Sequence, residues 1–404
     1  MLALAGSDAA SGAGIQASRI HAAMLRRGVE SRLLVKEKTG DGEFVEGLRR
    51  TRLGRWALFH RQRWERRSGY HLMLHPSSPG SPFAERIASA DLLHLHDVHS
   101  RFVHPAAIVR WTKRVPVVWT LQDMWAVTGK CIYAYDCDRW MRGCGRCPQL
   151  AEWPVLDKDR TDFLWRWKRH LFSNARLRLV APSRWLAEIV GRSPLLGHLP
   201  VEVIPNSVDV RTFRPGPKDE SRRALGIAPG AFVVAFGSHA SVPRKGFSHL
   251  LEATKKRRSR GEWTVLAMGE PLAGAANEPG IVWAGAVTAG EEMARHLRAA
   301  DVLCLPTLAE NLALVLLEAA ATGIASVAFD SGGTREAVAD GETGILAPPG
   351  DTSRLREAIE SLARDVPRRV SMGAAARLRA EREFDDDLVA ARYEAVYREI
   401  AYRR

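Results

Sequence analysis

Short apolar segments rich in β-branched residues alternate with segments of helical periodicity along most of the chain. The expected strands cover residues 91–95, 116–121, 177–181 and 202–204, then 231–237, 264–268, 281–284, 302–305 and 326–329, and residues 1–5 are expected to form a first strand. Helical patterns lie between them at 15–27, 185–190, 247–254, 291–299, 313–321 and 352–362. This alternation predicts an α/β fold in which right-handed βαβ units form parallel sheets.

The pattern restarts once, after a stretch rich in Pro and Gly between residues 205 and 219. Such a composition is typical of a linker between domains. We therefore expect two facing, doubly wound domains, 1–209 and 210–384, followed by a terminal helix over 385–404. Two facing domains create a cleft between them. Because ligands of such sheets bind at the carboxyl ends of the strands, we expect the ligand site in this cleft. Three aspartates, 385–387, begin the last helix, where capping is a better explanation than metal binding.

The composition is that of an ordinary globular protein, with 46% hydrophobic and 26% charged residues among 404. No run of eighteen uncharged apolar residues occurs, which argues against a transmembrane helix. The first apolar residues pass into Gly6-Ser7-Asp8 without a basic segment before them, so no secretory signal is expected. A cytoplasmic location with reduced cysteines is the expectation.

The net charge of +13 calls for an anionic partner. Nucleic acid is not expected, because nothing resembles a known nucleic-acid-binding motif. A basic segment between residues 49 and 67 combines arginines 49, 50, 52, 55, 61, 63, 66 and 67 with Leu53, Trp56, Leu58, Phe59 and Trp64. Two interpretations are open: a helix that lies on an anionic membrane, or a solvated helix whose tryptophans belong to the core. Residues 163–169 repeat the pattern.

Candidate ligand-binding residues follow several of the expected strands. Arg244-Lys245-Gly246 follows one strand and begins a helix, an arrangement that suits a diphosphate. Glu310 and Glu318 follow another strand. They either share one helix face or place Glu310 at the mouth of the helix and Glu318 within it. A sugar or ribose hydroxyl pair could satisfy a buried carboxylate there, and a glutamate that faces solvent is the alternative. Gly12 and Gly14 border either a ligand or only a tight strand-to-helix turn.

Four cysteines, Cys131, Cys137, Cys144 and Cys147, lie within one short segment. The Cys-x2-Cys spacing at its end suits a four-cysteine structural zinc site, while disulfides and free thiols are the alternatives. His94 and His96 alternate along a strand and are expected to be polar residues at the strand end, either lining the cleft or packed against it, rather than a metal pair.

The ordered set Arg244-Lys245-Gly246, Glu310/Glu318, Gly323 and Gly332-Gly333 resembles retaining nucleotide-sugar glycosyltransferases of family 4, which have the two-domain GT-B fold. Segments 181–184 (Ala-Pro-Ser-Arg) and 204–209 (Ile-Pro-Asn-Ser-Val-Asp) are similar to the inter-domain signatures of that family. Residues 120–125, with Cys131 and Tyr133, resemble a subgroup from bacterial exopolysaccharide gene clusters. The resemblance implies transfer of a sugar, with retention, from a nucleotide-diphosphate sugar to a saccharide or lipid-diphosphate-linked acceptor in surface polysaccharide biosynthesis.

The resemblance also implies roles for individual residues. Lys245 would neutralise the donor diphosphate, Glu318 would hold the ribose and Glu310 would meet the sugar. The donor site would also include Gly12, Gly14, Ser238, Arg244, Gly269, Val287, Asn311 and Leu312, and Gln122 and Asp123 would complete the catalytic group. The leaving phosphate would assist deprotonation of the acceptor, so that no cofactor or divalent metal is required. The terminal helix would return to the N-terminal domain, and the protein would be cytoplasmic or peripheral on the inner face of the plasma membrane.

Two positions depart from the pattern of the family. Gln122 stands where His is usual, and Ser238 stands where Arg is frequent. Glutamine can hydrogen-bond a sugar hydroxyl but cannot titrate, and Ser238 removes half of a cationic clamp unless Arg244 replaces it. A catalytically weakened pseudoenzyme that binds a nucleotide sugar or a glycan is therefore the alternative function.

Overall fold

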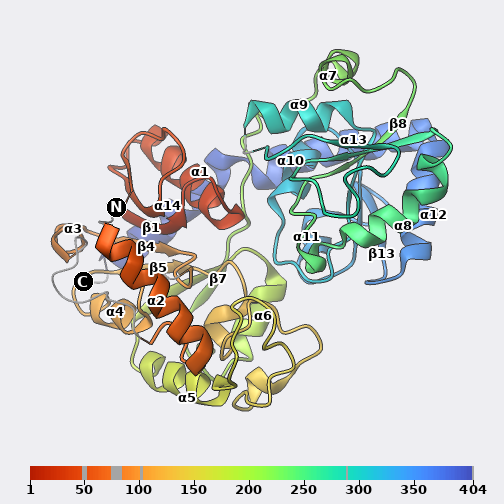
Figure 1. The fold of residues 1–404 in the computed structure, drawn as a ribbon. Helices are drawn as coiled ribbons and strands as arrows, with labels where there is room; N and C mark the ends of the chain where they lie inside the picture. The colour runs from red at the N-terminus through yellow and green to blue at the C-terminus, as the bar shows by residue number, and fades with distance from the viewer. Residues whose placement is uncertain (48–51, 74–83, 101–102, 288–289, 403–404) are drawn as a thin grey trace. The chain divides into compact units, whose positions relative to one another are not determined.

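The computed structural model describes residues 1–47, 52–73, 84–100, 103–287 and 290–402. The chain divides into two compact units, which are treated one at a time (Figure 1). The first unit holds residues 1–205 and 390–404, and the second holds 206–389.

The first unit is built on a seven-stranded parallel sheet with the order β3-β2-β1-β4-β5-β6-β7. Its strands are β1 (Leu2–Ser7), β2 (Arg32–Glu37), β3 (Val45–Gly47), β4 (Leu93–His96), β5 (Val117–Thr120), β6 (Leu177–Ala181) and β7 (Val201–Val203). Its helices are α1 (Gly12–Arg26), α2 (Arg52–Ser68), α3 (Ala84–Ala88), α4 (Pro105–Trp111), α5 (Thr161–Phe172) and α6 (Arg184–Gly191), with short 3-10 turns η1 (Met124–Val127) and η2 (Arg139–Met141).

The second unit repeats this order on a six-stranded parallel sheet, β10-β9-β8-β11-β12-β13. The strands are β8 (Phe232–Phe236), β9 (Trp263–Ala267), β10 (Ile281–Trp283), β11 (Val302–Leu305), β12 (Ser326–Phe329) and β13 (Gly344–Ala347). Its helices are α7 (Lys218–Ala224), α8 (Phe247–Arg258), α9 (Glu291–Ala299), α10 (Leu314–Ala321), α11 (Thr334–Ala337), α12 (Thr352–Arg364) and α13 (Val366–Arg379). α14 (Asp386–Tyr402) begins in this unit and ends in the first.

Helices cover both faces of the second sheet. α8 and α12 contact each other and share strand β11, while α9 and α10 contact each other and lie against β8 and β11 (Figure 1). With both faces covered, the central strands are apolar throughout, as in Phe236, Leu303 and Val327, which are fully buried. The predicted α/β class with two doubly wound parallel sheets is confirmed.

The strands that were not predicted have weaker patterns. In β2, charged residues at both ends leave a short buried apolar run, Leu33 to Val35, and β3 has only three residues. β13 contains Gly344, whose position is set by packing, because a Cβ there would lie 2.1 Å from the carbonyl oxygen of Ser326. These strands form because a neighbouring strand is already in place.

The start of α14 carries the expected cap. Asp385 Oδ1 accepts a hydrogen bond from the backbone N–H of Asp387 at 2.9 Å, so the aspartates serve the helix start. Farther along α14, within the first unit, Tyr397 Oη lies 2.7 Å from His94 Nδ1 and Tyr393 Oη lies 3.1 Å from Thr120 Oγ1. A buried polar network thus holds the end of the chain against β4 and β5.

Of the two placements left open by the sequence, lining a cleft or packing, His94 and His96 show packing. Both are fully buried, with His94 Nε2 bonded to Thr120 Oγ1 at 2.8 Å and His96 Nε2 lying 3.3 Å from His94 Nδ1. Burial lowers the pKa of His96 to about 3, and burial together with the neighbouring His96 lowers the pKa of His94. Both imidazoles are therefore neutral in the folded protein at neutral pH.

These two histidines make the stability of the protein depend on pH. Their pKa values are lower in the folded than in the unfolded chain, so below the ordinary value of 6.5 the unfolded chain binds more protons. The free energy of unfolding should fall as the pH drops from about 6.5 to 5, by up to about 1.4 kcal/mol per pH unit per histidine.

Urea unfolding at several pH values in this range measures the slope. His96→Asn removes one titrating group, and the slope of this variant should be smaller by about one proton. An identical slope in the variant would contradict the assignment of a depressed pKa to His96.

Candidate functional site

The predicted donor residues of the second unit lie at the carboxyl ends of its strands. β8 and β11 are neighbours in the sheet, with Val302 paired to Val234 and Leu303 to Ala235. The sheet order reverses between these two strands, which is where ligands bind in doubly wound folds. Arg244 and Lys245 follow β8, and residues 306–312 follow β11, so the two loops meet at this edge.

The two loops are joined through the backbone. The carbonyl oxygen of Arg244 accepts hydrogen bonds from Leu308 N at 2.8 Å and from Thr307 Oγ1 at 3.2 Å. Gly246 has a φ of 73°, and a Cβ there would lie 1.8 Å from the carbonyl oxygen of Pro306. Glycine at 246 is thus required both by its left-handed backbone and by the close approach of the loop after β11.

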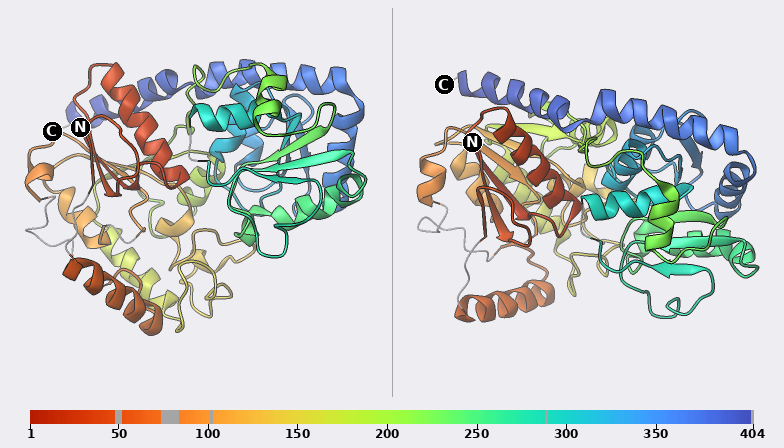
Figure 2. Two further views of the ribbon diagram at one scale, coloured as in Figure 1. Left: turned by 45° about the horizontal axis from the view of Figure 1, so that its top comes forward. Right: turned by 90° about the horizontal axis from the view of Figure 1, so that it is seen from above.

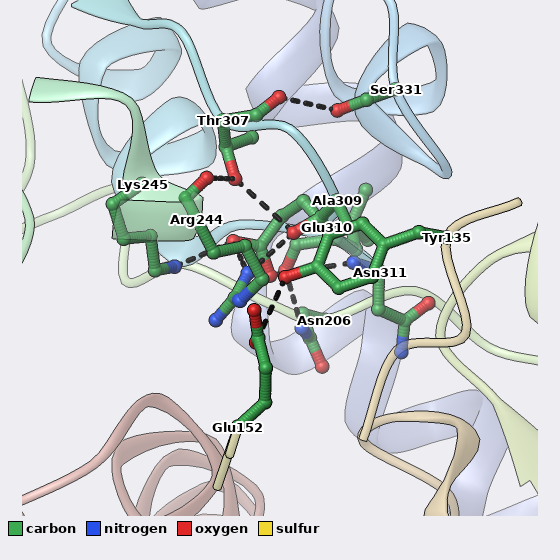
Figure 3. Close-up of polar contacts among 11 residues, drawn as sticks. Tyr135, Glu152, Asn206, Arg244, Lys245, Thr307, Ala309, Glu310, Asn311 and Ser331 are labelled. Carbon is green, nitrogen blue, oxygen red and sulfur yellow. Dashed lines mark hydrogen bonds and ion pairs between the residues drawn. The ribbon is translucent and has the colours of Figure 1, made fainter. Parts of the chain in front are cut away.

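Three charged side chains meet between these loops (Figure 3). Lys245 Nζ lies 2.5 Å from Glu310 Oε2, and Arg244 Nη1 lies 3.3 Å from the same oxygen and also donates to the carbonyl oxygen of Ala309. The exposed fraction of the side chain is 17% for Lys245, 14% for Arg244 and 9% for Glu310. Because little water screens them, the two cations and one carboxylate interact strongly and leave the cluster with a net positive charge.

The backbone of Glu310 is held in place by the glycine turn after β12. Gly333 N donates to the carbonyl oxygen of Glu310 at 3.0 Å, and a Cβ on Gly332 would lie 2.0 Å from that same oxygen. Glu310 Oε1 accepts from Asn311 N at 3.3 Å. The Gly332-Gly333 pair thus helps to hold the backbone that carries the Glu310 carboxylate.

Helix α10 begins at Leu314, so the alternative in which Glu310 and Glu318 share one helix face is wrong. Glu310 lies in the loop before the helix, and Glu318 is within it, with only 4% of its surface exposed. No side chain caps the N-terminus of α10 at Ala313. Asn206 Nδ2 donates to the carbonyl oxygen of Leu312 at 2.8 Å, which orders the approach to the helix.

The remaining donor candidates of this unit lie on loops at the same edge of the sheet. Ser238 follows β8, Gly269 follows β9, and Val287 follows β10. Gly269 forms an isolated bridge with Gly285, which joins the loops after β9 and β10. The structure therefore brings Arg244 and Lys245 into contact with Glu310, whose carboxylate also accepts from the N–H of Asn311. The other candidates follow strands that end at the same edge of the sheet.

In the first unit, Gly12 and Gly14 begin α1 after β1. Ser11 caps the helix, and its Oγ accepts from Gly14 N at 3.1 Å. A Cβ on Gly14 would lie 2.4 Å from the carbonyl oxygen of Ser7, so close packing of α1 on β1 accounts for this glycine. Of the two roles considered for Gly12 and Gly14, the tight strand-to-helix turn is present in the structure.

Gln122 and Asp123 follow β5, and both carboxylate oxygens of Asp123 are engaged. Oδ1 accepts from Trp125 N at 2.8 Å and caps η1, while Oδ2 lies 3.1 Å from His99 Nε2. The other ring nitrogen of His99 lies 3.3 Å from Asp97 Oδ1. Burial lowers the pKa of His99, but the charges of Asp123 and Asp97 outweigh it, and the pKa is raised.

His99 was not identified as a candidate residue from the sequence. The ring stacks on Trp125 with centroids 5.4 Å apart, and Lys168 Nζ lies 3.5 Å from the centre of the Trp125 ring. Three separate segments supply these residues, and no spacing in the sequence marks them as neighbours. The His99–Asp123 contact at the carboxyl ends of β4 and β5 is a polar site of the first unit.

The four cysteines are free thiols, and their expected zinc site is not supported. Within the described ranges, no group of three or more His, Cys, Asp or Glu side chains has the geometry to hold a metal ion. Cys131 Sγ and Cys147 Sγ lie 4.0 Å apart and form a hydrogen bond. This hydrogen bond, with burial, raises the pKa of Cys131, and the same bond lowers the pKa of Cys147 to about 6.

Comparison with known proteins places the chain in a family. The family described as "Glycosyltransferase Family 4" matches residues 10–212, and "Glycosyl transferases group 1" matches residues 231–365. The two doubly wound domains define the GT-B class of fold. The chain belongs to glycosyltransferase family 4.

Two relatives illustrate the extent of the similarity. The protein named as colanic acid biosynthesis glycosyl transferase WcaC of Escherichia coli (strain K12) is 32% identical over 137 residues, 31% of this chain and 33% of the relative. The D-inositol 3-phosphate glycosyltransferase of Stackebrandtia nassauensis is 34% identical over 222 residues, 49% of each chain. The chain spans about half or less of the length of these relatives.

Solved structures show the same fold over the whole chain. Sucrose-phosphate synthase from Thermosynechococcus elongatus matches with a TM-score of 0.73 at 18% identity. The match covers 100% of this chain and 99% of the synthase chain. Anabaena HepE, solved with UDP and glucose, has a TM-score of 0.67 at 20% identity, covering 98% of this chain and 99% of its own.

Proposed function

We propose that the protein is a retaining hexosyltransferase that moves a sugar from a nucleotide-diphosphate sugar to a saccharide or lipid-linked acceptor in bacterial surface polysaccharide biosynthesis. The observation that carries this proposal is the Arg244/Lys245/Glu310 cluster at the carboxyl ends of β8 and β11, just before the N-terminus of α10. The colanic acid relative supports the polysaccharide context, and the complex of HepE with UDP and glucose supports a uridine diphosphate sugar as donor.

A donor diphosphate would change the partner of Lys245. The ammonium group now pairs with Glu310 at 2.5 Å. A diphosphate carries more negative charge than one carboxylate, so it competes for Lys245 and Arg244 and releases Glu310 Oε2 to accept from a sugar hydroxyl. Glu318, buried four residues inside α10, is proposed to bind the ribose hydroxyls.

The chemical step breaks the bond between the anomeric carbon and the diphosphate oxygen. Negative charge then accumulates on the leaving diphosphate, where Lys245, Arg244 and the N–H groups of the first turn of α10 stabilise it. The acceptor hydroxyl attacks from the face on which the diphosphate leaves, and a phosphate oxygen takes its proton. Cations of the chain thus perform the neutralisation, and no divalent metal is required by this scheme.

Lys245→Ala should reduce kcat by about 10²–10³-fold, because it removes a cation that acts on the developing charge. Release of the nucleotide diphosphate from a panel of UDP- and GDP-sugars, with lipid-linked and saccharide acceptors, measures the effect. The matched control is Lys256→Ala, an exposed lysine of α8 that should leave turnover unchanged. Equal turnover in both variants would exclude Lys245 from the site.

A pseudoenzyme that binds a nucleotide sugar or a glycan is the second candidate function. Gln122 and Ser238 favour it, since neither side chain supplies the charge that the family pattern has there. In this case the protein would bind the nucleotide sugar, but adding an acceptor would not increase the rate at which nucleotide diphosphate is released.

Gln122→His combined with Ser238→Arg separates these two functions. For a weakened enzyme, the double variant should raise turnover about tenfold or more, because it restores a titratable group at position 122 and adds a further cation at position 238. Thermal shift with the same nucleotide sugars verifies binding, since a ligand that binds only the folded state stabilises it. Binding without any gain in turnover favours the pseudoenzyme.

Helix α2 supports a peripheral position on an anionic membrane. It lies at the margin of the first unit (Figure 2), and Trp56, Phe59 and Trp64 are 62%, 60% and 42% exposed. The interpretation in which these tryptophans belong to the core is therefore wrong. Arg49 and Arg50 lie outside the described residues. The second basic and aromatic segment, residues 163–169, does not expose all of its aromatic residues, because Trp165 is buried.

One exposed face of α2 combines aromatic and basic residues. Trp56, Phe59, Arg63 and Arg67 follow one another at three- and four-residue spacing, so they share one side of the helix. The opposite side of the helix faces the protein, where Glu65 is buried. Beside the exposed face, Arg66 Nε lies 2.9 Å from Asp157 Oδ1. Aromatic rings at the headgroup level and arginines near anionic lipids suit attachment to the cytoplasmic leaflet. No helix among the described residues has both the length and the apolar character needed to span a bilayer.

Trp56→Ala with Phe59→Ala should weaken binding to vesicles of phosphatidylglycerol and phosphatidylcholine by about tenfold or more, because the buried ring area is lost. Vesicle sedimentation measures the affinity. Phe44→Ala, at a comparably exposed phenylalanine outside α2, serves as the control. If both variants bind as the wild type does, or if pure phosphatidylcholine binds equally well, α2 does not recognise an anionic membrane.

A further inference from the structure

All four cysteines of segment 131–147 line one cavity of the first unit. Lys130, Trp140 and Thr161 also border this cavity. Each of the four cysteine residues is partly exposed to solvent, and none is in a disulfide. A small reagent from solution can therefore reach them, in contrast to Cys304, which is completely buried in β11.

Within the cavity, Cys131 and Cys147 are in direct contact. Their Sγ atoms lie 4.0 Å apart, and a disulfide requires them to approach by about 2 Å more, to roughly 2.05 Å. Cys144 is engaged differently, because its Sγ accepts from Gly129 N at 3.3 Å. Cys131 and Cys147 are thus positioned for a bond with each other.

Buried Lys130 holds the two cysteines together. Its Nζ donates to the carbonyl oxygens of Gln149, Glu152 and Pro154 at 2.5, 2.8 and 3.0 Å. Lys130 directly precedes Cys131, and its acceptors follow Cys147 within a few residues. This clamp therefore fixes the backbone beside one thiol to the backbone beside the other, whatever the state of the sulfur atoms.

The same ammonium group gives the cavity a positive charge. Lys130 is fully buried, and the contacts of its Nζ described above are to neutral carbonyl groups, so its charge acts on the neighbouring sulfur atoms with little screening. Lys168 Nζ, also buried, lies 2.7 Å from the carbonyl oxygen of Trp125 and 3.0 Å from that of Thr128, and burial lowers its pKa to about 7. Lys130 is therefore the cation that acts on the cavity. Nearby cations favour the thiolate, which is the form that attacks a disulfide.

We propose that Cys131 and Cys147 form a reversible disulfide by exchange with a low-molecular-weight disulfide such as oxidised glutathione. The Cys147 thiolate attacks one sulfur of the reagent, its S–S bond breaks, and one glutathione thiolate leaves. Cys131 then loses its proton to solvent and attacks Cys147 Sγ, and the second glutathione thiolate leaves. The two cysteines lose two electrons and two protons, and one oxidised glutathione becomes two reduced molecules. This modification does not depend on the proposed transferase activity.

The test incubates the full-length reduced protein with oxidised glutathione and determines its mass without reducing agent. The expected product is lighter by two hydrogen atoms, and proteolysis should yield one linked peptide pair containing Cys131 and Cys147. Cys131→Ser and Cys147→Ser should each prevent the link. The matched control, Cys137→Ser with Cys144→Ser, keeps the proposed pair and should form the link at the wild-type rate.

Closure of the segment should also raise the melting temperature of the first unit, by about 6 °C or more, and reduction with dithiothreitol should reverse the rise. Three results would overturn the proposal: a linked peptide that joins other cysteines, stable mixed disulfides with glutathione in place of the intramolecular bond, or zinc that copurifies in equal amount with the protein and protects all four thiols. Zinc content is measured on the same preparation before oxidation.

Discussion

The parallel pairing of β8 with β11 is the interaction on which the candidate donor site depends. These strands are distant in the sequence, and their pairing brings the loop that ends at Gly246 against the loop that contains Glu310. Only then can Lys245 and Arg244 reach one carboxylate oxygen. The close approach of Pro306 to Gly246 and of Glu310 to Gly332 leaves these loops little freedom, so the charges are held before any ligand binds.

An ion pair of this kind serves binding better than it serves stability. Removing two cations and a carboxylate from water is costly, and apolar residues in their place would be as stable or more so. The cluster carries two positive charges for one negative charge, so part of the charge is available to an anion. Its position beside the N-terminus of α10 adds backbone N–H groups directed at the same place.

The first unit also concentrates buried charge near the carboxyl ends of its strands. His99 lies between Asp97 and Asp123, and the Trp125 ring on which His99 stacks is also in contact with the ammonium group of Lys168. These groups come from the loop after β4, the loop after β5, and α5. Their proximity follows from the sheet order, in which β4 and β5 are neighbours, and from the packing of α5 residues such as Trp165 into the core beside them.

The sequence alone determined the α/β class, two doubly wound domains, and the order of the candidate donor residues, because hydrophobic periodicity and Gly-containing turns are local properties that each segment carries by itself. It also indicated Lys245, Glu310 and Glu318. Tertiary structure decided that Glu310 precedes α10 and pairs with Lys245, that Trp56 is exposed while Trp165 is buried, that His99 contacts Asp123, and that Cys131 contacts Cys147. Each of these contacts joins segments that meet only after the sheets are assembled, and no local spacing specifies such a meeting.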